Sequence, residues 1–290
     1  MEFIYDYMED EELRHQLNAL TRKTFGFDFE NWVTNGYYEG DYIPYSFVEN
    51  GQMIANISAN RMHFIQNGEE RSYIQIGTVM TDEAYCRQGL AKRLIERVVA
   101  EYMDWCDGIY LFSNLESIGF YRKMGFSQDV TEYRCTLKPG VKTKAAGGSL
   151  FAPAGDGMRQ KYITAVRNAA PNAALDQVNR FGLQMFYTAD MNDVFYADDI
   201  DCFAVIEQSG GAVTLQSVIC HESISLRYVL PRIAAEYNTL TLGFTPMAED
   251  AEMFDYAAYN GAEDYRLFCI GDKLKSIGEK RLLFPRLSHA

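Results

Sequence analysis

The sequence predicts a mixed α/β protein made of two units with the same fold, each with a central, mixed, mostly antiparallel, twisted sheet flanked by helices. The chain has 290 residues, of which 48% are hydrophobic, and this length favours about two domains. A stretch rich in glycine and poor in periodic apolar residues divides the chain near its middle. Strand-like and helical segments follow in a similar order on both sides of it. The predicted boundaries are 1–138 for the first unit, 139–157 for a linker and 158–290 for the second unit.

The first unit has the clearer pattern of elements. Two dipeptides typical of hairpin turns, Asn50-Gly51 and Asn67-Gly68, separate three strand-like runs between residues 45 and 81. Leu13, Leu17 and Leu20 recur at helical spacing in an earlier segment. The predicted order is a strand in 2–8, a helix in 9–25, a short helix and loop in 26–44, the three strands, a helix from 90, a strand in 108–113, a helix in 114–124 ended by Gly125, and a strand in 132–137.

The second unit is expected to repeat this order in a less regular form. The segments 202–220 and 239–245 are typical of a hairpin, with Gly210-Gly211 at its tip, and of a strand. The predicted helices are 161–170, 175–186, 225–237 with a possible kink at Pro231, and 251–261 ended by Gly261, and the last predicted strand is 263–270.

Composition excludes several classes of function. The net charge of −13 disfavours nucleic acid and anionic membranes as partners. It favours a cationic substrate, although an acidic surface can also serve only to keep a protein soluble. No run approaches the roughly 20 apolar residues of a membrane span, and the N-terminus is acidic, unlike a signal peptide. We therefore expect a cytoplasmic protein.

The cysteines lie far apart in the sequence. The chain has six of them and no C-x-x-C pair, which argues against a disulfide framework and against a cysteine zinc site. This pattern favours a reducing compartment, and we expect no metal.

The segment EAYCRQGLAKRL, residues 83–94, has the features of an anion site. Gly89 can adopt the backbone angles of a tight turn, after which a helix with cationic residues begins. Free N–H groups at the helix start, together with the helix dipole, attract phosphate. The groups concerned are the amides of Gln88, Gly89, Leu90 and Ala91 and the side chains of Arg87 and Lys92. Taken alone, the segment fits an ordinary helix with a solvated cationic face better than it fits a phosphate site. Rossmann and Walker glycine patterns are absent from the sequence.

Two motifs at the expected separation resemble those of the GNAT N-acetyltransferases. GTVMTDEAYCRQGLAKRLIERVV is similar to the acyl-CoA segment of that family, with Cys86 to Ala91 in the place of its Gln/Arg-x-x-Gly-x-Gly/Ala pattern. FSNLESIGFYRKMGF is similar to the second signature, with Asn114, Tyr121 and a Gly-Phe pair at 125–126. The resemblance covers roughly residues 1–138, and it implies an acetyltransferase domain that uses acetyl-CoA as co-substrate.

The resemblance also implies roles for particular residues. The backbone of Val79, Met80 and Thr81 would pair with the pantetheine arm and hold the oxyanion of the reaction. The pyrophosphate would lie on Arg87, Gln88, Gly89, Leu90, Ala91 and Lys92, with Asn114 binding the cofactor beyond it. Tyr121 would be the general acid that protonates the leaving thiolate, and a phenol of ordinary pKa near 10 would remain protonated at neutral pH. An amine would attack the thioester directly in a ternary complex.

Some positions depart from the family pattern. Cys86 stands where Arg or Gln is usual, and Gln75 stands where many members have a glutamate base. The base is therefore left open between ordered water, the carboxylate of Ala290 and the acidic segment 28–41, which contains Asp28, Glu30, Glu39 and Asp41. We expect His63 and His221 to be packed or surface residues.

The acceptor and the second unit are less defined. The resemblance implies that aromatic and acidic residues of 26–45 form the acceptor wall, although they could also be core residues; the aromatic ones are Trp32, Tyr37, Tyr38, Tyr42 and Tyr45. The second unit has no glycine matching Gly89, and its helix-ending glycine places Ala257 where Tyr121 stands, so we expect a degenerate domain that shapes the cleft or a subunit interface.

The function expected from this reading is N-acetylation of a small-molecule or peptide amine, with no nucleic-acid or membrane partner and with a homodimer left open. The alternatives are an acyl-CoA-binding sensor without turnover and a protein acetyltransferase.

Overall fold

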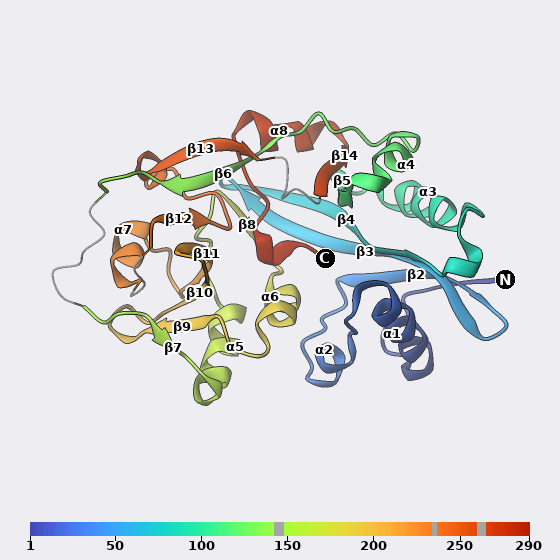
Figure 1. The fold of residues 1–290 in the computed structure, drawn as a ribbon, viewed down its shortest axis with the longest axis horizontal. Coiled ribbons are helices and arrows are strands. Elements are labelled where there is room, and N and C mark those ends of the chain that lie inside the picture. The colour runs from blue at the N-terminus through green and yellow to red at the C-terminus, as the bar shows by residue number, and fades with distance from the viewer. Residues whose placement is uncertain (142–147, 234–236, 260–264) are drawn as a thin grey trace.

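Two seven-stranded sheets lie next to each other in a computed structural model of the chain (Figure 1). It describes residues 1–141, 148–233, 237–259 and 265–290. The first sheet has the order β1 (Glu2–Tyr5), β2 (Tyr42–Glu49), β3 (Gln52–Gln66), β4 (Glu69–Thr81), β5 (Gly108–Asn114) and β14 (Tyr265–Ile270), with β8 (Leu175–Gln177) also paired to β3. The second has the order β13 (Phe254–Tyr259), β6 (Glu132–Leu137), β12 (Thr239–Leu242), β11 (Ala212–Ile219), β10 (Cys202–Ser209), β9 (Val194–Ala197) and β7 (Ala152–Pro153).

Helices cover both faces of the first sheet (Figure 1). The helices are α1 (Glu11–Phe25), α2 (Glu30–Thr34), α3 (Leu90–Tyr102), α4 (Ile118–Arg122), α5 (Arg159–Arg167), α6 (Phe181–Thr188), α7 (Leu226–Val229) and α8 (Lys275–Glu279). Leu17 and Leu20 of α1 bury against one face, whereas Leu90 and Leu94 of α3 bury against the other. The predicted fold class, two mixed sheets flanked by helices, is confirmed.

The local signals of the first unit are borne out. Asn50-Gly51 and Asn67-Gly68 form the predicted turns, and all four residues have positive φ between 48° and 84°. Helix α1 begins where the Asp10 side chain accepts the Leu13 N–H at 3.0 Å, and it ends at Gly26 in the left-handed conformation. The two turns and the helix in 9–25 were predicted from the sequence, whereas the caps of this helix were not.

The ends of the two units are exchanged between the sheets. Strand β6, predicted to close the first unit, pairs with β12 and β13 in the second sheet. In return β14 pairs antiparallel with β5 in the first sheet. A boundary at residue 138 therefore divides the sequence into two units, but it does not divide the structure into its two sheets. Residues 142–147 of the predicted linker lie outside the described residues.

Three predicted helices of the second unit are wrong in part, and the one at 225–237 is limited to α7 and a 3-10 turn at 230–232 among the described residues. Residues 254–259 form strand β13, which pairs along the whole of β6, because that strand would otherwise be an exposed edge. The predicted helix end at Gly261 lies outside the described residues. Ala257 was matched with Tyr121 on the assumption that both lie in equivalent helices, and this match fails because Ala257 lies in strand β13. Within 175–186 the first three residues are β8, which pairs with the end of β3 beyond the reach of β2, and only α6 is helical.

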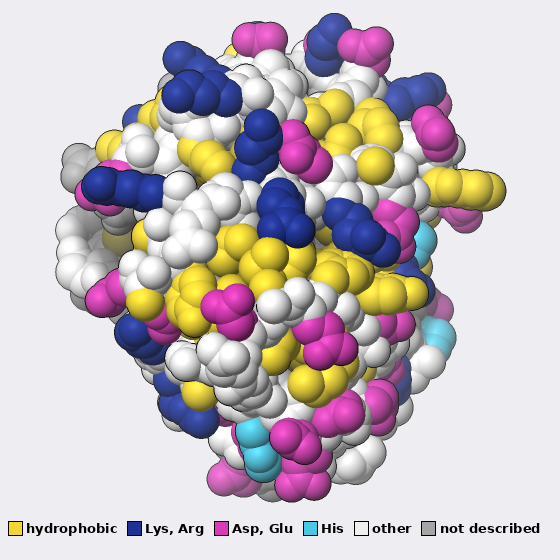
Figure 2. Space-filling model, turned by 90° about the vertical axis from the view of Figure 1, so that its right-hand side faces the viewer, with side chains coloured by type: hydrophobic (Ala, Val, Ile, Leu, Met, Phe, Trp, Pro, Cys, Tyr) yellow, Lys and Arg dark blue, Asp and Glu magenta, His cyan; other side chains and the backbone are white. Residues whose placement is uncertain are grey.

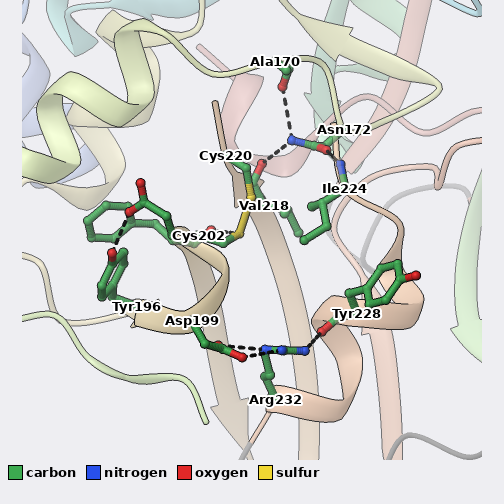
Figure 3. Close-up of a disulfide and its surroundings, with 12 residues drawn as sticks. Ala170, Asn172, Tyr196, Asp199, Cys202, Val218, Cys220, Ile224, Tyr228 and Arg232 are labelled. Carbon is green, nitrogen blue, oxygen red and sulfur yellow. Dashed lines mark hydrogen bonds and ion pairs between the residues drawn. A yellow bond between two sulfur atoms is a disulfide. The ribbon is translucent and has the colours of Figure 1, made fainter. Parts of the chain in front are cut away.

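A disulfide corrects the expectation from cysteine spacing. Cys202 at the start of β10 and Cys220 just beyond β11 are bonded, with their Cα atoms 4.9 Å apart (Figure 3). The hairpin brings together two residues that are 18 apart in sequence, and spacing alone does not indicate this. The cysteines therefore give no argument for a reducing compartment. Among the described residues, no helix is long and apolar enough to cross a membrane, and no cluster of three potential metal ligands occurs.

Candidate active site

The first sheet opens between two parallel strands. Residues 73–75 of β4 pair with residues 108–110 of β5, and beyond Gln75 and Tyr110 the two strands diverge. Strand β5 continues to Asn114 paired on its other side with β14. Because β4 also continues, to Thr81, a gap forms between the two strand ends within one sheet.

A β-bulge shapes the β4 side of this gap. Ser58 of β3 lies opposite Gly77 and Asn56 opposite Met80, so two residues of β4, Thr78 and Val79, face one residue of β3. Thr78 has a φ of 40°, and its carbonyl oxygen accepts the Asn56 side-chain amide at 3.1 Å. The bulge thus interrupts the regular pairing at the residues predicted to meet the thioester.

The gap contains a cavity of about 360 Å³, which we call the strand cavity. Its wall consists of Gln75, Ile76, Gly77, Thr78 and Val79 of β4, Phe112, Ser113 and Asn114 of β5, Ser117, Phe120 and Tyr121 after it, and Phe25, His289 and Ala290. Three residues predicted from the two motifs, Val79, Asn114 and Tyr121, therefore line one cavity. Met80 turns its side chain into the core on the other side of the sheet.

Tyr121 is held in place by aromatic packing. Its ring centroid lies 5.6 Å from that of Phe268 on β14 and 6.2 Å from that of Phe126. Burial raises the pKa of Tyr121 to about 12, so the phenol is protonated throughout the neutral range. Since Phe268 belongs to the exchanged strand, the second half of the chain helps to position this residue.

The predicted phosphate segment has an open helix start. Gly89 has a φ of 77° and precedes α3, and no side chain among the described residues caps that helix. Arg87 is also left-handed, with a φ of 64°, and Lys92 forms only a solvent-exposed pair with Glu96 at 3.6 Å. The first-turn N–H groups therefore remain available to a ligand. These residues lie outside the wall of the strand cavity.

Charge is unevenly distributed around this helix. Figure 2 shows the face that bears α1 and α3, where Lys and Arg side chains cluster across hydrophobic ones and the acidic groups gather mostly at one side. Arg93 lies 4.5 Å above the ring of Phe47, and Arg97 lies 4.1 Å above that of Phe3. These two arginines of α3 therefore pack on aromatic rings in addition to contributing positive charge to the surface.

The C-terminal segment, residues 283–290, reaches the strand cavity with His289 and Ala290. The Gln75 side-chain amide donates to the Ala290 oxygen at 3.0 Å, and Tyr187 donates to the His289 carbonyl at 2.6 Å. A Cβ at Gly77 would lie 2.5 Å from the Ala290 oxygen, so only glycine allows this approach. His289 stacks on Phe112 with 3.9 Å between ring centroids, and burial lowers its pKa to about 3, which keeps it neutral.

A second cavity of about 320 Å³, the aromatic cavity, adjoins the first. It is lined by Phe25, Phe27, Phe29, Trp32, Tyr42, Thr78, Leu183, Phe186, Tyr187, His289 and Ala290. Phe25, Thr78, His289 and Ala290 border both cavities, so the two meet at the bulge and the C-terminal segment. Helix α6, from the second half of the chain, contributes three of the residues in its wall.

Only part of the predicted acceptor wall is found there. Trp32 and Tyr42 line the aromatic cavity, whereas Tyr45 is in the core and donates to Glu101, and Tyr37 and Tyr38 lie outside the wall. The acidic residues of the segment have partners elsewhere. Glu30 bonds to Arg14 and Asn18, Asp28 to Arg22, Glu39 to Arg167 and Asp41 to Asn179. None of these four carboxylates lines either large cavity, whereas Glu39 and Asp41 line a small pocket that shares Trp32 and Tyr42 with the aromatic cavity.

Other residues fit or extend the sequence reading. His63 and His221 are exposed, as expected. Gln75 is buried, and its side-chain amide donates a hydrogen bond to Ala290. An amide cannot act as a general base, so the base must come from another group. Leu183, Phe186 and Tyr187 were missed, since they lie in the predicted second unit, more than 100 residues after the segment 26–45, and carry no motif.

The second sheet has the corresponding parallel strand pair, β11 and β12, without an open helix start after it. Helix α7 follows β11 as α3 follows β4, but it has only four residues. Its start is occupied by a carboxylate, because Asp250 accepts the Leu226 N–H and the Ser225 hydroxyl, both at 2.6 Å. Asp250 is buried. An internal anion thus stands where an incoming phosphate would have to bind.

A family model described as the acetyltransferase (GNAT) family matches residues 3–126, which contain both motifs and most of the strand cavity. This part of the chain is a GNAT acetyltransferase domain. The match supports acyl transfer in general. No curated protein sequence matches the chain significantly.

Solved structures extend the likeness to both sheets. A GCN5-related N-acetyltransferase from Kribbella flavida matches 95% of this chain and 73% of its own, with a TM-score of 0.56 and 16% identity. A probable N-acyltransferase of unknown function from Enterococcus faecalis V583 matches 94% and 73%, with a TM-score of 0.56 and 11% identity. Eis1 from Mycobacterium abscessus matches 92% and 73%, with a TM-score of 0.55 and 10% identity. At these identities the likeness shows the fold alone.

Proposed function

We propose that the protein is an acetyl-CoA-dependent N-acetyltransferase acting on a primary amine. The observation that carries the proposal is the meeting of the two cavities at the bulge of β4. The strand cavity would take the pantetheine arm and thioester, with Val79 to Thr81 pairing to the arm and Asn114 beyond it. The start of α3, from Arg87 to Lys92, would hold the pyrophosphate, and the aromatic cavity would hold the amine.

The proposed reaction is direct transfer within a ternary complex. The nitrogen lone pair of the amine attacks the thioester carbon, and a backbone N–H near the bulge stabilises the oxyanion. The tetrahedral intermediate then collapses, the C–S bond breaks, and Tyr121 donates its proton to the sulfur. A base removes the extra proton from the nitrogen, so that the products are the amide and the CoA thiol.

Our candidate for the base is the carboxyl group of Ala290. It is the one carboxyl position in the shared border of the two cavities among the described residues, provided that the mature chain ends there. Asp28, Glu30, Glu39 and Asp41 are held by other partners and lie outside both walls. Intact-mass measurement of the purified protein establishes the chain end.

The test is thiol release from acetyl-CoA with a panel of amines, with CoA binding measured separately by calorimetry. We expect Tyr121→Phe to lower kcat by about 100-fold or more while the Kd for CoA changes little, because the proton donor is lost and the ring packing remains. Two glycines added after Ala290 should also lower kcat, since they move the carboxylate by about 7 Å. The same addition before Met1 is the control.

CoA binding without turnover of any amine would refute the enzyme and favour an acyl-CoA-binding sensor. Acetylation of proteins but not of small amines, detected by mass spectrometry of treated lysates, would favour a protein acetyltransferase.

A further inference from the structure

We propose that the aromatic cavity selects monoamines carried on a compact apolar body, such as arylalkyl and alkyl amines, and rejects amines with a second positive charge. The inference rests on the proposed acetyl transfer and names the substrate class of the same site.

The cavity wall is built from mutually packed rings. The centroids of Phe29 and Tyr42 lie 4.8 Å apart, those of Phe27 and Phe186 5.5 Å, and those of Trp32 and Phe186 5.8 Å. These contacts join the segment after α1 to α6, so the wall is fixed from both halves of the chain. A volume of about 320 Å³ is at the small end of ligand cavities and fits one ring with a short chain.

The polar side-chain groups of Trp32, Tyr42, Thr78 and Tyr187 in this wall already have partners. The Trp32 indole donates to the Gly182 carbonyl at 2.8 Å, and the hydroxyl of Tyr42 shares a hydrogen bond with that of Thr78 at 2.9 Å. Tyr187 donates to the C-terminal segment. A hydroxyl-rich acceptor would therefore lose its bonds to water without replacing them, which costs binding free energy.

Charge gives the sharper discrimination. No Asp, Glu, Lys or Arg side chain among the described residues lines the aromatic cavity. Apolar surroundings lower the pKa of an ammonium group, so a bound monoamine would be held closer to its neutral, nucleophilic form. A second ammonium deeper in the cavity, away from the Ala290 carboxyl group at the shared border, would have no side-chain carboxylate of the wall to pair with, and burying it would cost several kcal/mol. The net charge of −13 attracts both kinds of amine to the surface, so the selection takes place in the cavity.

A matched pair of acceptors tests the proposal. Hexylamine and 1,5-diaminopentane have equal numbers of heavy atoms and differ only in a terminal methyl or ammonium group. We expect kcat/KM to favour hexylamine by at least about 100-fold, with 2-phenylethylamine also accepted. A ratio near one, or a preference for the diamine, would overturn the inference while leaving acetyl transfer intact.

A substitution locates the effect in the cavity. Leu183→Asp places a carboxylate in the wall and should lower the ratio of hexylamine to diamine by about tenfold or more. Leu183→Asn, of nearly the same shape without the charge, should leave the diamine rejected. Val178→Asp is the surface control, since Val178 is 57% exposed and outside the wall, and it should leave the ratio unchanged. An equal change with Val178→Asp would contradict selection within the cavity.

Binding is measured without turnover to keep the two proposals separate. In a Trp105→Phe background, Trp32 is the remaining tryptophan and reports on occupancy of the cavity by its fluorescence. Saturable quenching by hexylamine but not by the diamine, lost in Leu183→Asp, supports the selection even if no amine is acetylated. Quenching by neither amine, or equally by both, overturns it.

Discussion

Glu132 shows how one buried residue can hold the C-terminal segment. Its Oε1 accepts the Phe284 N–H at 2.9 Å, and Thr245 in turn accepts the Leu283 N–H at 2.8 Å. Burial raises the pKa of Glu132 to about 8, so the carboxyl holds a proton at neutral pH in the folded protein. The position of Ala290 therefore depends on hydrogen bonds to Glu132 and Thr245, which lie outside the two motifs.

Glu132→Gln should alter how stability depends on pH. The folded pKa of Glu132 is raised above its ordinary value of 4.5, so its contribution is fully present below about pH 4.5 and is lost as pH rises toward about 8. Glutamine keeps the acceptor and does not titrate. We expect the two proteins to have similar free energies of unfolding at pH 5, and wild type to be less stable than the variant by about 3–5 kcal/mol at pH 9.

Urea unfolding at both pH values measures this difference. Parallel pH dependence of the two proteins would mean that Glu132 is ionised in the folded state.

Among elements, the contrast between α3 and α7 explains why only one half of the chain is expected to bind CoA. Helix α3 has 13 residues and an uncapped start after Gly89. The four-residue α7 is capped by Ser225 and blocked by Asp250. The same strand–turn–helix unit thus leaves the helix start open to an anion in the first sheet. In the second sheet the Asp250 side chain occupies the helix start.

Substitutions at Gly89 test the anion site. No heavy atom lies within 4 Å of a Cβ built there, so only the positive φ and the charge matter. Asn and Asp both tolerate the left-handed conformation and have nearly equal size. We expect Gly89→Asp to weaken CoA binding at least about tenfold relative to Gly89→Asn, because the added charge repels pyrophosphate.

Calorimetric titration with CoA measures the two affinities, and the difference between the variants should shrink at high salt. Equal affinities of the two variants at low salt would mean that the pyrophosphate does not bind at this helix start.

At the scale of the whole molecule, exchange of β6 and β14 makes the two sheets interdependent. Without β14, β5 would present an open edge, and Tyr121 would lose its contact with Phe268. One buried cluster also contains residues from both halves, among them Leu17 and Tyr162. The predicted units 1–138 and 158–290 are therefore expected to fold only together.

Two buried thiols can report on this cooperativity. Cys135 lies in β6 of the second sheet and Cys269 in β14 of the first, and both are reduced and buried. We expect their protection from alkylation to be lost at the same urea concentration, and residues 1–138 expressed alone to remain unfolded. Mass spectrometry of labelled peptides measures both midpoints. Separate midpoints, or a folded 1–138 fragment, would show that the sheets are independent.

The sequence by itself determined whatever depends on neighbouring residues. Hairpin turns at Asn50-Gly51 and Asn67-Gly68, the caps of α1 and the left-handed Gly89 follow from local backbone chemistry. Tyr121 and Asn114 were named because their motif resembles that of the GNAT family, and they do line one cavity.

Only the tertiary structure decided which strands pair across the sheets and what surrounds the site. Residues 254–259 became a strand because β6 provides an edge, and the 202–220 disulfide closes a hairpin. The acidic residues of 28–41 turned to partners elsewhere, and the wall of the aromatic cavity was completed by Phe186 from the other half. Strand pairing of β6 with β13, the Arg167–Glu39 pair and the contacts of Phe186 join residues more than 100 positions apart, and burial and edge pairing, which no local pattern encodes, select them.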